Sequence, residues 1–315
     1  MEKIIRIGTR DSRLAVWQAS QVKAMLEIQG CVCELVKVKS EGDLDLVTPL
    51  YAMGVQGVFT KTLDAYLLSN KIDVAVHSMK DVPTQLAQGI ATAAVLKRAN
   101  YKDLFVYKNE HVLEKYFYSD VDEQRLAEGV IATGSVRRKA ALLNKFPKIR
   151  VENLRGNVQT RMQKLMNNDW DAAIFAAAGL ERLDERPAYA IEIDWMLPAP
   201  AQGAIAVVCR EEDVEVKEIC APLNDQHTML CVNNERDFLK TLMGGCSTPV
   251  SALAQVENNK LKFSGNIIAL DGSEILEIEK EVDLHDATEV GIGCAQELLA
   301  NGADKIVEQI RSINK

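Results

Sequence analysis

Several features of exported, membrane-bound and metal-binding proteins are missing from this sequence of 315 residues. No apolar run reaches the length of a transmembrane helix, and residues 1–7 enter a strand-like run without the long apolar stretch of a signal peptide. We therefore expect a cytoplasmic protein that does not associate with membranes. The seven cysteines include no Cys-x-x-Cys pair, which argues for reduced thiols and against a metal site.

An excess of basic residues is missing as well. The chain has 37 Lys and Arg against 45 Asp and Glu, a net charge of −8 at pH 7. Binding to a nucleic-acid backbone needs a basic surface that releases counterions, so we expect no nucleic-acid partner. A local group of arginines in such an acidic chain therefore needs an explanation of its own.

The first two-thirds of the chain alternates short β-branched runs with amphipathic helical stretches. This alternation is typical of an α/β fold with helices packed on a mostly parallel sheet. Two units look alike: residues 7–12 and 132–138 each run from a strand through Gly and Thr into a serine placed to cap the next helix. The repetition predicts two similar α/β domains.

The last third of the chain has a different pattern. Two prolines exclude a helix interior from residues 197–202, so we interpret this stretch as a crossing back between domains before a strand at 204–208. A long helix at 229–242, three alternating runs and a last helix at 288–301 then predict a small α+β domain with a short antiparallel sheet. The predicted domains are residues 1–99 with 200–220, residues 100–199, and residues 221–315.

Arginines stand at the start of one predicted helix. Ser135 would cap this helix, and Arg137 and Arg138 fall in its first turn. Positive side chains at the positive end of a helix dipole are unfavourable unless an anion binds there. The pattern indicates an anion site.

The arrangement recurs at two other helix starts. Arg155 and Arg161 flank a helix that Asn157 can cap, and Arg10 precedes the cap residue Ser12. Any single arginine is usually a solvated surface charge. Three such helix starts in one acidic chain favour a ligand with several carboxylates or phosphates.

A polar loop at residues 77–83 follows the apolar strand at 72–76. Polar groups at the carboxyl end of a strand in an open α/β sheet lie where such folds bind ligands. Asp81 beside Lys80 should stay ionised, which suits a fixed anion that faces a cationic substrate. An ordinary polar loop with a helix-capping Asp fits the spacing equally well.

Cys246 lies in a turn of unusual composition. Two glycines precede it and Pro249 follows, so the turn lets a bulky group approach the sulfur. A tight turn around a buried thiol fits the same composition. The motif becomes informative only together with the others.

Taken together, these segments resemble the porphobilinogen deaminase family. The matching blocks follow the family order from residue 4 to about residue 256, and the chain length is similar. Several blocks in order are more specific than any one motif. The blocks are residues 7–12, 75–83, 133–138, 154–161, 178–183, 197–204 and 244–249.

The resemblance implies a dipyrromethane cofactor bound through a thioether to Cys246. It implies a transferase that condenses four porphobilinogen molecules stepwise, with loss of ammonia, and releases the linear tetrapyrrole hydroxymethylbilane by hydrolysis. Asp81 matches the catalytic carboxylate, which would stabilise the cation formed as ammonia leaves. The family also implies a monomer of three domains, the first two arranged like type II periplasmic binding proteins.

The resemblance also assigns binding residues. Each pyrrole carries an acetate and a propionate, which bidentate guanidinium groups suit better than ammonium groups. The family pattern implies cofactor contacts from Cys246, Lys80, Asp81, Ser135, Arg137, Arg138, Arg155 and Gly156, and substrate contacts from Arg10, Ser12, Ser78, Arg155, Arg161 and Arg182.

The sequence departs from the family pattern in three places. Gln56 stands where a lysine of a Gly-Lys-Gly loop is expected, so one anion contact changes. Residues 97–104 differ from the more common Asp-Pro-Arg-Asp-Ala, and Ala201 replaces a frequent glycine. None of these differences touches Asp81 or Cys246.

Two other classes of protein share some of these features. An exported binding protein would have the same two-domain cleft and arginines, but the N-terminus shows no export signal. A transferase with Cys246 as its nucleophile should have a base near the thiol, and no histidine lies close in sequence. The mass of two added pyrrole units would separate the deaminase from both alternatives.

Overall fold

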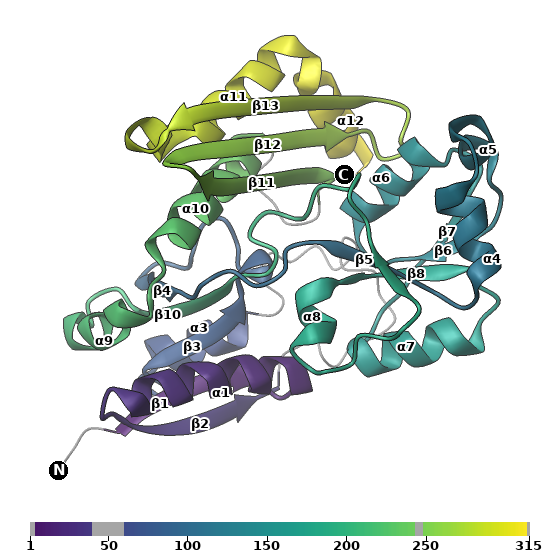
Figure 1. The fold of residues 1–315 in the computed structure, drawn as a ribbon. Helices are drawn as coiled ribbons and strands as arrows, with labels where there is room; N and C mark the ends of the chain where they lie inside the picture. The colour runs from purple at the N-terminus through teal and green to yellow at the C-terminus, as the bar shows by residue number, and fades with distance from the viewer. Residues whose placement is uncertain (1–3, 40–59, 243–247, 314–315) are drawn as a thin grey trace.

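The structure is a computed structural model that describes residues 4–39, 60–242 and 248–313. Its strands form three sheets, two of mixed direction and one antiparallel (Figure 1). We call them the N-terminal, central and C-terminal sheets. In Figure 1 the C-terminal sheet lies above the other two.

The N-terminal sheet takes one inner strand from far along the chain. Its first three strands in sequence run parallel, and the late strand runs antiparallel to both of its neighbours. The order across the sheet is β2 (Val32–Val38), β1 (Ile4–Arg10), β3 (Val74–Ser78), β10 (Ile205–Arg210) and β4 (Ile90–Val95).

Helices cover both faces of this sheet. Side chains of α1 (Arg13–Ile28) and α9 (Val214–Cys220) share one hydrophobic cluster with the sheet. Side chains of α3 (Lys61–Leu68) belong to a second hydrophobic cluster. Along the strands, the residues of this second cluster alternate with those of the first cluster. A strand covered on both faces needs the continuous apolar sequence seen in β3 and β10.

The central sheet repeats this arrangement of strand directions. Its order is β7 (Arg150–Glu152), β6 (Val130–Ala132), β8 (Ala172–Ala176), β5 (Asp103–Tyr107) and β9 (Ala190–Glu192). The first three are parallel, and β5 is antiparallel to both β8 and β9. The prediction of two similar α/β units is confirmed. The helices around the sheet are α4 (Glu110–Leu113), the π-helical turn η3 (Glu114–Tyr118), α5 (Val121–Leu126), α6 (Val136–Lys145), α7 (Val158–Asn167) and α8 (Ala177–Glu181).

The predicted helix caps are present. The side-chain oxygen of Ser12 accepts from the backbone N–H of Ala15 at 3.3 Å, and that of Ser135 accepts from Arg138 at 3.4 Å. Asn157 caps α7 through the N–H of Thr160 at 2.9 Å. These caps satisfy free N–H groups and set where α1, α6 and α7 begin, directly after the strands whose ends they adjoin.

The C-terminal sheet is antiparallel, as the sequence predicts. Its strands are β11 (Val250–Glu257), β12 (Lys260–Ile268) and β13 (Ile275–Asp283). The long helix α10 begins three residues earlier than predicted. None of the helices within residues 4–39, 60–242 and 248–313 is long and apolar enough to span a membrane. The helices packed with this sheet are α10 (Gln226–Leu242), α11 (Val290–Leu298), the π-helical turn η6 (Leu299–Ala303) and α12 (Asp304–Ile313).

The C-terminal part contacts both mixed-sheet units. Glu235 of α10 is fully buried and accepts from both terminal nitrogens of Arg98, at 2.5 and 3.1 Å. It also accepts from the backbone N–H of Ala201 at 2.7 Å, so one carboxylate joins α10 to both chain crossings. On the other side, Asn144 of α6 donates to the carbonyl of Gly272 at 2.9 Å. A buried charge needs such partners, and these contacts orient the three parts.

Candidate active site

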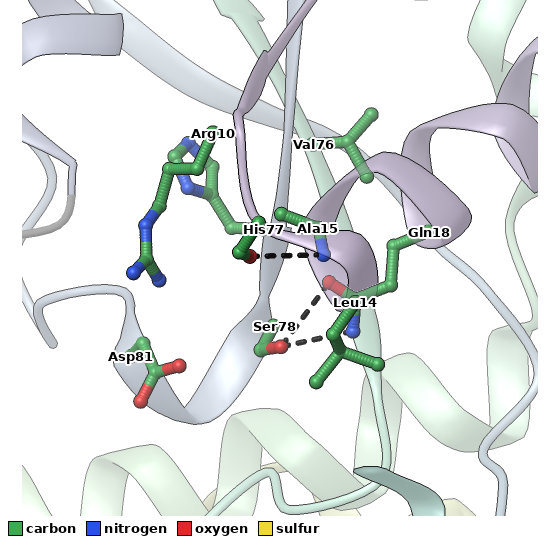
Figure 2. A pocket seen from close by; sticks show the side chains of 9 residues that line it. Arg10, Leu14, Ala15, Gln18, Val76, His77, Ser78 and Asp81 are labelled. Carbon is green, nitrogen blue, oxygen red and sulfur yellow. Dashed lines mark hydrogen bonds between the residues drawn. The ribbon is translucent and has the colours of Figure 1, made fainter. Parts of the chain in front are cut away.

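A pocket opens where β1 and β3 end (Figure 2). Arg10 closes β1, Ser78 closes β3, and Asp81 ends the single 3-10 turn η2 (Met79–Asp81). Gln18 of α1 donates to the hydroxyl of Ser78 at 2.9 Å. Figure 2 shows the Arg10 guanidinium and the Asp81 carboxylate on the same side of the pocket. The predicted loop and the Arg10–Ser12 segment therefore form one site.

His77 is a buried, neutral member of this pocket. Burial and the charge of Arg10 lower its pKa to about 4. Its Nε2 atom has no hydrogen-bond partner among the residues that the structure describes. At neutral pH His77 therefore adds no charge beside Asp81.

Arg137 and Arg138 are buried, and a carboxylate that the sequence analysis missed holds them. They are 4% and 5% exposed, so they are not solvated surface charges. Each donates through Nη2 to Asp103, at 2.5 and 2.7 Å, and Asp103 is fully buried. Burial alone would raise the pKa of Asp103, but the two arginines outweigh it and hold that pKa below its ordinary value.

This buried group still has more positive than negative charge. Two guanidinium groups face one carboxylate, and their Nη1 atoms donate to the carbonyls of Leu197 (2.6 Å) and Ile174 (3.0 Å). The Nε–H groups of Arg137 and Arg138 are buried without a partner in the described part of the chain. Unpaired buried donors beside excess positive charge suit an anionic ligand.

Gln202 connects this group to the Asp81 loop. It is fully buried in the crossing, and its amide nitrogen donates to the Asp103 carboxylate at 2.8 Å. Its amide oxygen accepts from Lys80 Nζ at 3.1 Å. Burial and the nearby charge of Arg138 lower the pKa of Lys80 to about 8. The N-terminal and central sheets thus contribute to one electrostatic site.

Arg155 and Arg161 belong to the same site. Arg155 is 5% exposed, and Arg161 donates through Nε to the carbonyl of Gly156 at 2.7 Å. Gly156 has φ +116°, which favours glycine, and a Cβ there would lie 2.7 Å from Thr160 Cγ2. Burial and then the charge of Arg138 lower the pKa of Arg161 to about 10, against the opposite effect of Asp81.

We call the residues of this site the basic cluster. It combines side chains from both mixed-sheet units, and its cations outnumber its carboxylates. Such a set can bind a ligand with several carboxylates while it keeps one carboxylate at the pocket. The members are Arg10, Lys80, Asp81, Asp103, Arg137, Arg138, Arg155 and Arg161.

Arg182 occupies a different position. Its guanidinium lies over the ring of Trp17, 5.8 Å from the centroid, and donates to the carbonyl of Gly203 at 2.7 Å. These contacts join the segment after α8 to α1 and to the crossing. Its predicted contact with substrate stays a prediction.

Two residues singled out in the sequence, Gln56 and Cys246, lie outside the described residues. The last described residue before Cys246 is Leu242, which ends α10, and the chain is described again from Thr248. Across 4–39, 60–242 and 248–313, no group of three or more His, Cys, Asp or Glu side chains is arranged to hold a metal ion.

Family models match most of the chain. Residues 5–218 match the model "Porphobilinogen deaminase, dipyromethane cofactor binding domain". Residues 229–300 match "Porphobilinogen deaminase, C-terminal domain". The two matches follow each other in sequence. The first match includes every member of the basic cluster.

Solved structures of low sequence identity resemble parts of this chain. The VFT2 domain of BvgS from Bordetella pertussis is 14% identical, with a TM-score of 0.43 over 69% of this chain and 85% of that one. An ancestral cationic amino acid solute-binding protein is 13% identical, with a TM-score of 0.46 over 70% of this chain and 87% of that one.

Proposed function

The chain belongs to the porphobilinogen deaminase family, and we propose that the basic cluster is its active site. The chain is a transferase with hydroxymethylbilane synthase function, which acts on a dipyrromethane cofactor. It condenses four porphobilinogen molecules and releases the linear tetrapyrrole by hydrolysis. The observation that carries the placement of the active site is the excess of buried guanidinium groups beside one partly exposed carboxylate, Asp81.

The basic cluster fits the cofactor. Two linked pyrroles with acetate and propionate groups bring several carboxylates, and the unpaired Nε–H groups of Arg137 and Arg138 are donors suited to them. When bound, the cofactor supplies the pyrrole carbon to which the first substrate is joined. We propose that Cys246 holds it covalently. The other proposed cofactor contacts are Lys80, Asp81, Ser135, Arg137, Arg138, Arg155 and Gly156.

We assign the catalytic role to Asp81. Its carboxylate is fixed at the end of η2 and lies on the same side of the pocket as Arg10 (Figure 2). A fixed anion there can accept hydrogen bonds from pyrrole N–H groups and stabilise positive charge as porphobilinogen loses ammonia. The arginines would hold substrate carboxylates and so orient each substrate. The proposed substrate contacts are Arg10, Ser12, Ser78, Arg155, Arg161 and Arg182.

We further propose a cytoplasmic monomer of three domains, with boundaries at 1–99 with 200–220, 100–199 and 221–315. Each sheet has a main hydrophobic cluster of its own, which supports this division, and Ile268 of β12 also joins the cluster of the central sheet. The acidic net charge of −8 supports the absence of a nucleic-acid partner.

The intact mass of the denatured protein tests the cofactor assignment. We expect the wild type to exceed its sequence mass by two pyrrole units, and Cys246→Ser to show the sequence mass and no turnover. An exported binding protein, or a transferase with a cysteine nucleophile, would show no increment. An increment retained in Cys246→Ser would exclude this cysteine as the attachment point.

The same variant tests whether the cofactor stabilises the fold. A ligand bound only by the native state stabilises that state, so Cys246→Ser should melt at a lower temperature than wild type. Mass spectra of both samples establish cofactor occupancy. Equal melting temperatures would show that the cofactor does not hold the domains together.

A further inference from the structure

The turn that carries Asp81 is short. The 3-10 turn η2 spans three residues and closes through one bond, from the N–H of Val82 to the carbonyl of Met79 at 3.1 Å. The N–H of Met79 donates to Ala204 at 3.0 Å. A single turn of this kind is marginal unless other parts of the protein hold it.

Arg236 of α10 supplies that support. Its Nη1 donates to the carbonyl of Val82 at 2.9 Å and, more weakly, to that of Met79 at 3.4 Å. Its Nη2 donates to the carbonyl of Pro83 at 2.6 Å. One planar guanidinium thus binds carbonyls on both sides of Asp81, and the rigid fork loses little freedom in doing so.

Apolar contacts reinforce this bond pattern. Met79 and Val82 are buried in one hydrophobic cluster with Val232 of α10, and Met229 packs against the same cluster. Residues 229, 232 and 236 lie three and four positions apart, so they share one face of α10. That face is the part of the C-terminal domain that meets the catalytic loop.

We propose that Arg236 is a positioning residue for Asp81 and makes the Asp81 turn and helix α10 one rigid unit. Helix α10 ends at Leu242, four residues before the proposed attachment point Cys246. Arg236 therefore holds the catalytic carboxylate at a constant position relative to the helix that leads to the cofactor. The inference rests on the proposed role of Asp81.

Arg236→Gln tests this role directly. We expect kcat to fall about tenfold to a hundredfold in cofactor-loaded protein, because a reacting group displaced by about 1 Å can cost that much. KM should stay close to wild type, since the arginines that bind carboxylates are untouched. Backbone amides of residues 80–82 should exchange hydrogen faster, and intact mass should show normal occupancy.

Two further variants calibrate the effect. Lys240→Gln removes a positive charge from an exposed site on the same helix and should keep wild-type kcat. Arg236→Lys keeps the charge but lacks the planar fork, so its kcat should fall between those of wild type and Arg236→Gln. If kcat falls equally in Arg236→Lys and Arg236→Gln, the positive charge of the lysine has no effect, and the planar guanidinium of Arg236 accounts for the whole loss.

A double-mutant cycle with Asp81→Asn separates positioning from general structural damage. If Arg236 acts through Asp81, adding Arg236→Gln to Asp81→Asn should lower the residual rate of pyrrole addition by less than about twofold. Independent effects would multiply. Full multiplication, or a loss explained entirely by lower occupancy or melting temperature, would overturn the role of Arg236 and leave that of Asp81 intact. Wild-type turnover in Asp81→Asn alone would overturn the Asp81 assignment, and the role of Arg236 with it.

Discussion

The two mixed sheets have the same pattern of strand directions, but they present their carboxylates to the site in different ways. The N-terminal sheet presents its carboxylate, Asp81, on a short turn at the pocket. The central sheet presents Arg137 and Arg138 in the first turn of a helix, nearly fully buried and bound to Asp103. The likeness of fold therefore does not extend to chemistry.

The difference shows which contacts hold the charged groups of each mixed-sheet unit in place. The arginines of the central unit are oriented by a counterion from their own sheet, which holds them before any ligand arrives. The turn that carries Asp81 is instead held by hydrogen bonds from Arg236 of α10 to the carbonyls of Val82 and Pro83. Removing the Asp81 carboxylate should therefore lower the rate, and removing the Asp103 carboxylate should lower the stability.

The largest effect is expected at Asp81. Asp81→Asn should reduce turnover about a hundredfold or more while the melting temperature stays near that of wild type, because the lost charge acts on the reaction and not on the fold. Asp81→Glu should keep more activity than Asp81→Asn. Steady-state rates on cofactor-loaded protein provide the measurement, and near-normal turnover in Asp81→Asn would remove the residue from the mechanism.

Asp103→Asn should instead destabilise the protein. The substitution leaves two buried guanidinium groups without their shared carboxylate, which typically lowers the free energy of unfolding by about 3–5 kcal/mol. Denaturant unfolding of wild type and variant measures the loss. Because cofactor carboxylates could replace part of the missing charge, the cofactor-loaded variant should recover part of the lost stability.

An exposed ion pair offers the matched control for Asp103. Glu281 accepts from Lys260 at 2.6 Å, with both side chains more than two-fifths exposed. Glu281→Gln should leave the free energy of unfolding nearly unchanged, since solvent screens such pairs. If Asp103→Asn behaves like Glu281→Gln, the buried group does not contribute to stability as described.

The smallest effect concerns pH and Lys80. Burial disfavours the charged amine, so the pKa of about 8 means that Lys80 loses its proton as the pH rises through that value. Because kcat/KM reports the ionisation of free enzyme, it should decline above about pH 8 as a cation of the site is lost. Lys80→Arg stays charged and should move the decline to higher pH. Identical profiles in the two proteins would assign the decline to another group.

Local sequence signals predicted the parts of the site that follow directly from strand ends and helix caps. The Ser12, Ser135 and Asn157 caps are where the pattern placed them, because a cap depends on residues three positions apart. The loop after β3 was expected at the carboxyl end of its strand. The strand itself begins and ends two residues later than predicted, so Ser78 is its last residue.

Contacts between distant residues could not be predicted in this way. Asp103 lies 34 and 35 positions from its arginines, and Arg236 lies more than 150 from the carbonyls it binds. The strand β5 was also missed, although β3 and β10, which have the same continuous apolar sequence, were predicted. A lone Asp at the start of such a run, in a chain with two adjacent arginines, is the signal that would have found Asp103.

The late arrival of β10 has a consequence for synthesis of the chain. The strands of the central sheet all fall between residues 103 and 192, so that sheet can be complete before the rest of the protein has left the ribosome. The N-terminal sheet cannot, because β10 lies between β3 and β4 and ends at Arg210. In a nascent chain that ends before β10, β4 lacks β10, the strand it pairs with in the described structure, and β3 has an unpaired edge. An unpaired strand edge can pair with another chain.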